Sequence, residues 1–277
     1  MTEKVSYEDR YCLFLDILGF QSHVEESVAD NPNSKKLMTF GKLKSVLKRI
    51  SDGVNYRQGI EVNGQTQLSS RCVTQFSDSV VISYLKKELN GSGVSSILND
   101  VHRLQLDLMR SGVLLRGAIS SGPLFHDSDF VFGPALNEAV ALEKLANYPR
   151  VIVDGQILNE AGLKPSAKSM KPSGWARDSG SLVTGDFDGL YYVDYFNAHP
   201  QDFDEEWTAL FEYLESLRGV VRGLANKKDP SLKVKHSWLR TKFNAMIGPL
   251  EKSGFKEIGG ISVPSEDTHL FQKLKSF

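Results

Sequence analysis

YCLFLDILGF, residues 11–20, is the first long apolar run of this 277-residue chain. The run is too short for a typical helix and is closed by Gly19, so it predicts a buried β-strand over residues 11–17. One acidic residue, Asp16, interrupts it. Because a buried carboxylate without a partner is costly, Asp16 is expected to be paired, hydrogen-bonded or bound to a metal ion.

The segments that follow alternate between helical and strand patterns. A polar loop containing Asn and Pro is expected directly after the first strand, and residues 37–50 then carry apolar side chains at helical spacing. Two β-rich runs, RCVTQF (71–76) and SVVISYL (79–85), predict a tight hairpin with Asp78 at its tip. The remaining patterns predict a helix over 94–110, a strand in VLLRGAISSG (113–122), a helix that begins after FGP (132–134), and strands in RVIVDG (150–155) and GLYYVDYF (189–196).

This order of elements predicts an α+β domain with a mostly antiparallel, ferredoxin-like sheet covered by helices on one face. The C-terminal part is different, because apolar stripes in 207–217 and 238–247 predict two helices joined by the loop NKKDPS (226–231). We therefore expect a main domain over 1–198 and a helical extension over 199–277. The extension should pack on that domain or on a second subunit, since its apolar faces need a partner.

The composition is that of an ordinary globular protein. Positive and negative charges almost cancel to a net of -1, which does not indicate a nucleic-acid or membrane partner. The first residues carry no apolar core of signal-peptide length and no later run approaches a membrane span, so a cytoplasmic location is expected. Cys12 and Cys72 lie in apolar segments and are interpreted as buried packing residues. The six histidines are scattered, and His126 makes no recognisable metal spacing.

Asp78, like Asp16, is an acidic residue next to apolar strand residues, because it lies between the β-rich runs 71–76 and 79–85. If the first strand neighbours the hairpin, the two carboxylates meet across adjacent strands and offer oxygen ligands to hard cations such as Mg²⁺ or Mn²⁺. The structural alternative is that Asp16 caps the strand end and that Asp78 only forms the hairpin turn.

Four segments, in this order and at these intervals, resemble the signature segments of class III nucleotidyl cyclases, the catalytic domains of adenylate and guanylate cyclases. They are FLDILGF (14–20), QFSDSVVIS (75–83), LLRGAISSGPL (114–124) and VFGPALNEAVALEKLA (131–146). The resemblance covers roughly residues 10–155 and is most specific at FLDILGF. It implies an enzyme that converts a nucleoside triphosphate to the 3′,5′-cyclic monophosphate and pyrophosphate.

The resemblance also implies roles for individual residues. Asp16, Asp78 and the backbone carbonyl of Ile17 match the ligands of two divalent ions, Mn²⁺ or Mg²⁺. Arg116 matches a phosphate-binding arginine, and Asn137 matches the asparagine that orients the ribose. The alternatives are an edge-strand surface arginine for Arg116 and a helix-cap or core amide for Asn137.

One catalytic position departs from the family pattern. Family members carry an arginine one helical turn after the asparagine, which stabilises the charge that develops on the α-phosphate, and this chain has Ala141 there. Lys144 and Arg71 are the candidate replacements. Without a substitute, the chain would be an inactive nucleotide-binding signalling module, which is the alternative to an enzyme.

The base-reading positions depart as well. Thr74 and Pro134 stand where adenylate cyclases read adenine, and neither side chain can reproduce that reading. Together with Phe20, Arg116 and Asn137 they form the nucleotide-binding set that the resemblance implies. This departure and the FLDILGF form of the first motif resemble the pyrimidine cyclases of Pycsar anti-phage systems, which make cyclic UMP or cyclic CMP.

The substrate hypothesis is therefore UTP, with CTP only slightly less favoured, and a purine cyclase as the alternative. Active sites of the family form between two catalytic domains, so the resemblance implies a homodimer. It also implies that the product acts on a separate cyclic-nucleotide-sensing effector. A different palm-type enzyme, such as a diguanylate cyclase, is a further alternative that rests on fold analogy alone.

Overall fold

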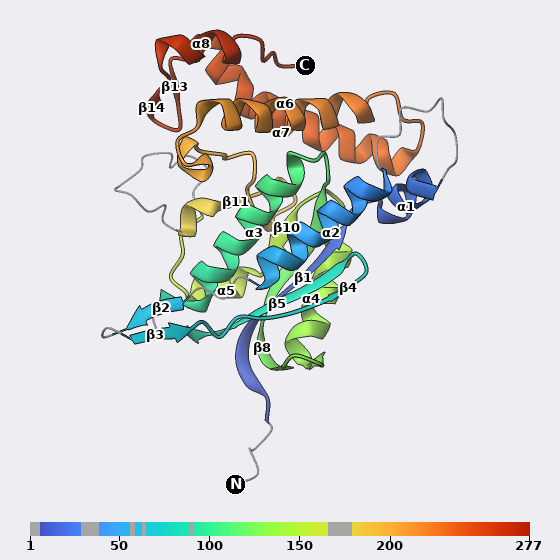
Figure 1. Ribbon diagram of the computed structural model, residues 1–277, viewed down its shortest axis with the longest axis vertical. Helices are drawn as coiled ribbons and strands as arrows, with labels where there is room; N and C mark the ends of the chain where they lie inside the picture. Colours follow the sequence, from blue (N-terminus) through green and yellow to red (C-terminus); the bar gives the residue numbers. More distant parts are fainter. Residues whose placement is uncertain (1–5, 29–38, 56–58, 63–64, 89–90, 166–178) are drawn as a thin grey trace.

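The computed structural model describes residues 6–28, 39–55, 59–62, 65–88, 91–165 and 179–277 (Figure 1). Its central strand is β1 (Glu8–Ile17), which pairs antiparallel with β5 (Ser79–Leu85) on one side and with β8 (Leu115–His126) on the other. β4 (Cys72–Phe76) lies beyond β5 as the edge strand. The order β8-β1-β5-β4 places β5 between β1 and β4, which is the split arrangement of a ferredoxin-like sheet.

The sheet extends past β8, and β10 pairs parallel to β8 while the other ladders of this sheet are antiparallel among the residues described. The α+β fold class with a mostly antiparallel sheet is therefore confirmed. The additional strands of the sheet are β10 (Val151–Val153), β12 (Tyr191–Val193), β11 (Val183–Gly185) and β9 (Val131–Phe132). Small separate hairpins are formed by β2 (Gly59–Val62) with β3 (Gln65–Leu68), β6 (Lys87–Glu88) with β7 (Gly91–Ser92), and β13 (Glu257–Ile258) with β14 (Ile261–Ser262).

Helices cover both faces of the sheet, not one as the sequence predicted. Leu13 of β1 belongs to the main core with residues of α2 (Phe40–Asn55), α3 (Gly93–Met109) and α5 (Gly155–Glu160). Its neighbour Cys12 belongs to a second cluster with Ala135 and Ala139 of α4 (Pro134–Leu145). Because successive residues of a strand point to opposite faces, the continuous apolar run of β1 needs a cover on each side.

A helix, α1 (Phe20–Val28), stands where the sequence analysis expected a loop directly after β1. Phe20 and Val24, one turn apart, pack against the main core. Gly19 has a φ of 77, a backbone conformation that glycine adopts without strain, and it lets the chain leave the strand and enter the helix. The prediction missed this helix because Phe20, Val24 and the exposed Val28 give only a short helical period, and the Asn- and Pro-containing part of the expected loop lies outside the described residues.

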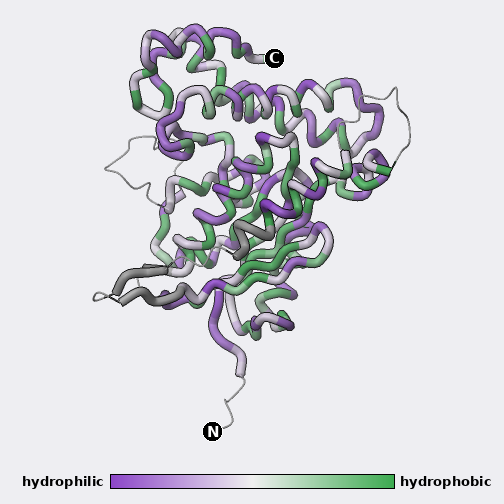
Figure 2. Tube along the Cα trace, in the orientation of Figure 1, coloured by the Kyte–Doolittle hydropathy of each residue, from purple (hydrophilic) through white to green (hydrophobic). Residues whose placement is uncertain are grey.

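The C-terminal helices α6 (Trp207–Leu224), α7 (Pro230–Lys252) and α8 (Ser265–Phe271) form a layer across one end of the sheet, with the N-terminus at the other end (Figure 1). Two 3-10 turns, η1 (Ser179–Leu182) and η2 (Pro200–Phe203), lie in the segment before them. Leu210 of α6 and Phe243 of α7 share a buried cluster with Met109 of α3 and Tyr192 of β12. Figure 2 shows hydrophobic residues along the central strands. None of the helices in the described part of the chain is both long and apolar enough to cross a bilayer.

A buried ion-pair network fixes α7 to the sheet. Arg150, which is fully buried, forms ion pairs with Asp186 and Asp188. Asp186 also binds two residues of α7, because it lies 2.9 Å from Lys242 Nζ and accepts a hydrogen bond from Trp238 Nε1 at 2.8 Å. The Trp238 ring in turn stacks on Tyr148, with ring centroids 5.4 Å apart. The packing of α7 against the residues that follow α4 is therefore held by both charge and aromatic contact.

Candidate functional site

Asp16 lies near the end of β1, opposite Ser79 of β5 and Arg116 of β8. It points to the same face as Cys12, the face that α4 covers further along the strand. The side chain is only 24% exposed, and its carboxylate lies 3.5 Å from Arg116 Nη2. The register of the sheet therefore sets an acidic and a basic side chain next to each other at one strand end.

Asp78 is brought to the same place by the β4–β5 hairpin. Ser77 in the turn has a φ of 57, and Asp78 directly precedes Ser79, the residue that pairs with Asp16. The two carboxyl groups lie close enough for Asp78 to act on the titration of Asp16. Burial, followed by the charge of Asp78, raises the pKa of Asp16 to about 6, while the Arg116 guanidinium works in the opposite direction.

This carboxylate pair fits a divalent cation. Two carboxylates in contact repel each other unless a proton or a cation lies between them, and hard cations prefer such oxygen donors. Ile17, the last residue of β1, stands beside Asp16 and its backbone oxygen is the further donor implied by the resemblance. Within the described ranges, no three His, Cys, Asp or Glu side chains gather as a metal-type cluster, so the remaining ligands would come from backbone, water or substrate.

Arg116 has a second acidic partner that the sequence analysis missed, Glu143 of α4. The Nε of Arg116 forms an ion pair with Glu143 Oε1, and Glu143 is only 5% exposed. The charge of Glu143 also contributes to the raised pKa of Asp16. Glu143 follows an apolar run on an amphipathic helix, and nothing in the sequence distinguishes a buried glutamate there from a surface one. Arg116 is thus held between the strand layer and the helix layer.

A second cation approaches from the C-terminal layer. Lys235 lies on α7, one turn before Trp238, and is partly buried. Burial and the nearby Arg116 guanidinium lower the pKa of Lys235, while Asp229 works in the opposite direction. Leu18, which follows the Asp16 strand, packs against the cluster that contains Trp238. The first turns of α7 therefore lie close to the Asp16 and Arg116 end of the sheet.

Arg71 and Lys144, the candidates to replace the catalytic arginine that is missing at Ala141, do not belong to the Asp16 and Arg116 cluster. Arg71 is buried and pairs with Asp100 of α3, with 2.6 Å between Nε and Oδ2, so it is committed to the other helical layer. Lys144 is exposed on α4, adjacent in sequence to Glu143 but on a different side of the helix. The suggestion of Arg71 was wrong because the sequence does not show to which face its side chain turns.

The other residues that the resemblance assigned lie around this centre. Asn137 is exposed in the first turns of α4, about 9 Å along the helix axis from Glu143. Pro134 is the exposed first residue of that helix, and Phe20 opens α1 with its ring packed on the core. Arg116 lies beside Asp16, and Asp78 is near enough to act on the Asp16 carboxyl, while Asn137 and Pro134 lie at the start of α4, in earlier turns of the helix than Glu143.

Thr74 belongs to a polar network that sequence reasoning did not foresee. Its Oγ1 lies 3.1 Å from His126 Nε2, and His126 Nδ1 lies 2.8 Å from Ser83 Oγ. Arg10 Nε donates to the same Ser83 oxygen at 2.9 Å, and its Nη2 donates to Cys72 Sγ at 3.4 Å. Cys72 is therefore half-buried in a polar setting, while Cys12 is buried as predicted. Burial and then the charge of Arg10 lower the pKa of His126 to about 4, so the ring is neutral near pH 7.

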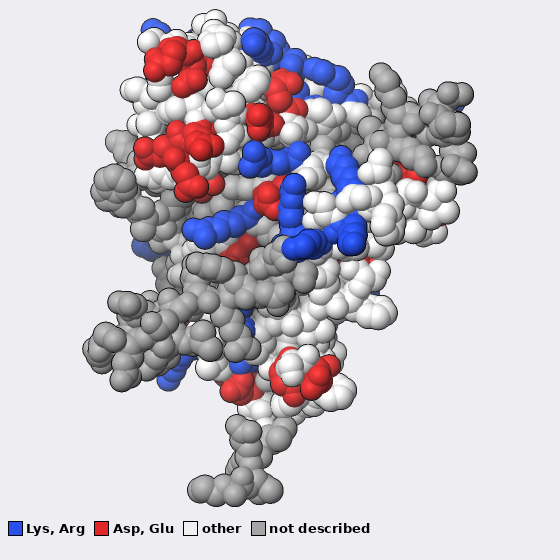
Figure 3. Space-filling model, in the orientation of Figure 1, with Lys and Arg blue, Asp and Glu red and all other residues white. Residues whose placement is uncertain are grey.

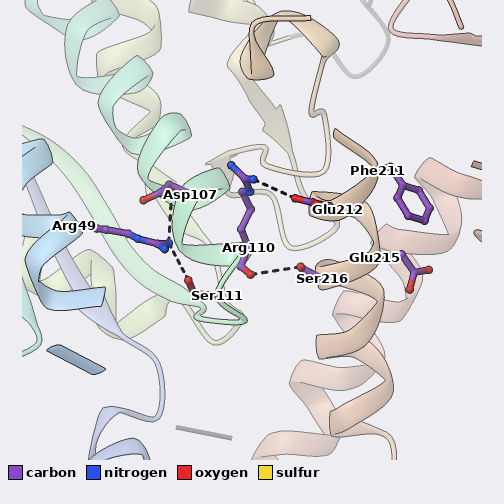
Figure 4. A pocket seen from close by; sticks show the side chains of 8 residues that line it. All are labelled: Arg49, Asp107, Arg110, Ser111, Phe211, Glu212, Glu215 and Ser216. Carbon is purple, nitrogen blue, oxygen red and sulfur yellow. Dashed lines mark hydrogen bonds and ion pairs between the residues drawn. The ribbon is translucent and has the colours of Figure 1, made fainter. Parts of the chain in front are cut away.

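A charged pocket of about 500 Å³ lies elsewhere, between α2, α3 and α6 (Figure 4). Its arginines are already paired, with 3.6 Å between Arg49 and Asp107 and 3.3 Å between Arg110 and Glu212. Lys and Arg side chains gather over the same α2 and α3 side of the molecule (Figure 3). The charged groups that line this pocket therefore pair with one another. None of the candidate site residues lines it, so it is separate from the Asp16 centre.

No family model matches the sequence, and no curated protein matches it. The guanylyl cyclase Cya2 is similar in structure, with a TM-score of 0.41 and 13% identity over 67% of this chain and 91% of that chain. The catalytic core of a rhodopsin-guanylyl cyclase with converted specificity, in complex with ATPαS, has a TM-score of 0.39 and 15% identity over 68% and 96%. A class III adenylyl cyclase-like ATP-binding protein from Pseudomonas aeruginosa has a TM-score of 0.37 and 12% identity over 91% and 72%. These three solved structures are a guanylyl cyclase, the catalytic core of a second guanylyl cyclase and an adenylyl cyclase-like ATP-binding protein.

Proposed function

We propose that this chain is a nucleotidyl cyclase that converts a pyrimidine nucleoside triphosphate, UTP or CTP, to the 3′,5′-cyclic monophosphate and pyrophosphate. The observation that carries the proposal is that the sheet register sets Asp16 beside the Arg116 guanidinium and next to the turn residue Asp78, whose charge acts on Asp16. Two acidic oxygens and one guanidinium at one strand end suit a metal-bound polyphosphate better than a neutral ligand.

In this proposal Asp16, Asp78 and the Ile17 carbonyl hold two divalent ions, Mn²⁺ or Mg²⁺. When bound, such ions promote attack by the ribose 3′ oxygen on the α-phosphorus and offset charge on the leaving pyrophosphate. Arg116 binds phosphate oxygens through its planar fork of donors, and its contacts with Asp16 and Glu143 hold that fork at the strand end. Asn137 is assigned to the ribose.

Lys235 supplies the additional positive charge in this account. Arg116 pairs with Asp16 and Glu143, and Asp78 lies near Asp16, so the group carries an excess of acidic side chains when all are ionised. A triphosphate adds further negative charge, which metal ions and nearby cations must offset. Lys235 of α7 is partly buried and lies close enough to Arg116 for the two charges to interact. We therefore assign to it the neutralisation of triphosphate charge.

The base preference rests on Thr74 and Pro134, because neither offers the side-chain groups by which adenylate cyclases read adenine. A role in bacterial anti-phage signalling, with the product acting on a separate effector, rests on the resemblance of FLDILGF and its companion segments to the Pycsar cyclases. A homodimer is part of the same proposal. Large exposed apolar side chains near the site, Phe76 (82%) and Leu145 (54%), are the kind of surface that a second subunit covers.

The proposal is tested by incubating the full chain with each of UTP, CTP, ATP and GTP in the presence of Mn²⁺, with products identified by mass spectrometry. The expected product is cyclic UMP or cyclic CMP. Cyclic AMP as the sole product would contradict the pyrimidine assignment and support a purine cyclase. Tight triphosphate binding without any cyclic product would support the inactive signalling module.

A further inference from the structure

We propose that Glu143 is a positioning residue that draws Arg116 away from Asp16 and thereby keeps Asp16 available to a divalent cation. The inference rests on the cyclase function proposed above and adds a control of metal affinity at the same site. It follows from the unequal way in which the Arg116 guanidinium is divided between two acidic side chains.

Strand pairing fixes the backbones of Arg116 and Asp16 relative to each other. The two residues are direct partners in the antiparallel ladder between β1 and β8, and such partners lie on the same face of a sheet. The distance between guanidinium and carboxylate therefore changes only through the torsions of the two side chains. A second partner of Arg116 consequently decides how closely its charge approaches Asp16.

The close packing of α4 on the sheet provides that second partner. Ala135 and Ala139 of α4 are buried against the strands, as is Ala146 directly after the helix, and Glu143 lies one turn after Ala139 on the same helical face. Glu143 is consequently only 5% exposed, although it is an acidic residue. A carboxylate buried in this way needs a cationic partner, and the ion pair with Arg116 Nε supplies one.

The two contacts of Arg116 differ in closeness. Nη2 lies 3.5 Å from Asp16 Oδ2, which is beyond the usual length of an N–H···O hydrogen bond, while the ion pair between Nε and Glu143 Oε1 is much closer. The Glu143 side chain is also the more buried of the two acids, at 7% exposure against 24% for Asp16, and burial strengthens an interaction between charges. Arg116 is thus held mainly by the helix layer.

A cation beside Asp16 opposes the binding of metal ions there. A guanidinium repels a divalent ion and competes with it for the same carboxylate oxygens. Without Glu143, the fork of Arg116 would be able to turn to Asp16 and engage both oxygens of that carboxylate. By holding Nε, Glu143 limits this competition and leaves the Asp16 oxygens accessible to a metal ion.

The same arrangement couples metal ions to the triphosphate. Phosphate oxygens match the planar fork of Arg116, so a bound phosphate takes over donors that otherwise face Asp16. Triphosphate and divalent cations then favour each other's binding, and by linkage the coupling is equal in both directions. In the absence of triphosphate, Arg116 should lower the affinity of the site for free divalent cations.

The test is the affinity of the full chain for Mn²⁺ without nucleotide, measured from the electron paramagnetic resonance signal of free Mn²⁺. Arg116→Met removes the competing cation and keeps an aliphatic stem, so it should tighten Mn²⁺ binding by about tenfold. Glu143→Gln should weaken it by about tenfold, because Arg116 then turns to Asp16. A merely structural role of this ion pair predicts weaker binding in both variants.

The double variant Arg116→Met/Glu143→Gln separates the action of Glu143 through Arg116 from the loss of its own charge. It should bind Mn²⁺ more tightly than the unaltered chain and within about threefold of Arg116→Met. It leaves no unpaired buried carboxylate, so it tests the claim even where Arg116→Met does not fold. Arg110→Met and Glu212→Gln, which alter the exposed ion pair of the separate charged pocket, are the matched controls and should leave the affinity unchanged.

The outcomes separate the inference from the function on which it rests. Suppose that Asp16→Asn abolishes Mn²⁺ binding, but the double variant binds no more tightly than the unaltered chain or Glu143→Gln binds equally well. The inference is then overturned and the metal site stands. Absence of any Mn²⁺ binding that depends on Asp16 overturns both. In the enzyme assay, Glu143→Gln should regain turnover as Mn²⁺ is raised, and a loss that added Mn²⁺ does not restore would contradict the inference.

Discussion

Arg116 and Asp16 lie directly opposite each other in neighbouring strands, with 3.5 Å between the guanidinium Nη2 and the carboxylate. The same guanidinium reaches Glu143 of α4 through Nε. One side chain thus connects the central strand with the helix on its outer face. Because two of its nitrogens form ion pairs with acids in different layers, the position depends on the forked shape of arginine as well as on its charge.

Replacing Arg116 with lysine should therefore not preserve function. A lysine carries the charge but cannot reach two acidic partners and a phosphate with a planar fork, so KM for the triphosphate should rise by about 10- to 100-fold. Steady-state kinetics of Arg116→Lys and Arg116→Ala test this. Arg116→Lys keeps a cation beside the buried Glu143 and should fold, and thermal melting shows whether Arg116→Ala, which leaves that carboxylate without its partner, does so too. Equal kinetics for Arg116→Lys and the unaltered chain would contradict the role given to the fork.

Lys235→Met should weaken triphosphate binding by about tenfold, because it removes the α7 cation near Arg116 while keeping the aliphatic stem. Lys233→Met is the matched control, since Lys233 lies on the same helix and is exposed. Titration calorimetry with a non-cleavable triphosphate analogue measures the difference. Similar affinities for both variants would show that α7 does not take part in binding.

His126 should make the fold sensitive to mild acid. Its pKa is about 4 in the folded chain against an ordinary value of 6.5, so the unfolded chain binds more protons between these values. Stability should therefore decrease as the pH falls from about 6.5 toward about 4, by up to about 3 kcal/mol from this group. Arg10 and Asp127 are the charged groups that act on the ring.

Urea unfolding at pH 7.5 and at pH 5 measures this effect in the unaltered chain and in His126→Gln. The loss of stability between the two pH values should be smaller in the variant. His269→Gln, at an exposed position, serves as the control and should behave as the unaltered chain does. An identical loss in the His126→Gln variant would rule out a buried neutral histidine.

Asp186→Asn should destabilise the attachment of α7. Asp186 is buried and binds Arg150, Lys242 and Trp238, so loss of its charge leaves two cations with less compensation. Breaking a buried ion pair costs about 3–5 kcal/mol, which urea unfolding can detect. Glu212→Gln, in an exposed pair with Arg110, should have little effect. Equal stability of the two variants would contradict the structural role of the network.

The sequence was most informative where periodic apolar patterns determine the structure. The strand around Asp16, the hairpin with Ser77 and Asp78 in its turn, and the helix that starts at Pro134 were all predicted and are confirmed. Such elements depend on local spacing and turn chemistry, which can be read from one chain. The short helix α1 was missed because its nine residues carry only three apolar positions, Phe20, Val24 and Val28, which give a short periodic signal.

The partners of the candidate site were less predictable. Glu143, Lys235 and His126 come from separate helices and strands, and only tertiary packing brings them to Arg116 and Thr74. Their sequence neighbourhoods look like ordinary amphipathic helix and loop. Arg71 was wrongly included in the candidate site. Its position just before the hairpin suggested that it lies near Asp78, but its side chain pairs with Asp100 on the other face of the sheet.

The most direct measurement is Mn²⁺-dependent cyclic-nucleotide formation by the unaltered chain, Asp16→Asn and Asp78→Asn. Each substitution removes a metal-binding oxygen charge and should lower turnover by at least about 100-fold. Thermal stability without metal should be kept or raised, because the contact between two carboxylates is relieved. Turnover close to that of the unaltered chain in either variant would contradict the claim that these two aspartates jointly hold the metal ions.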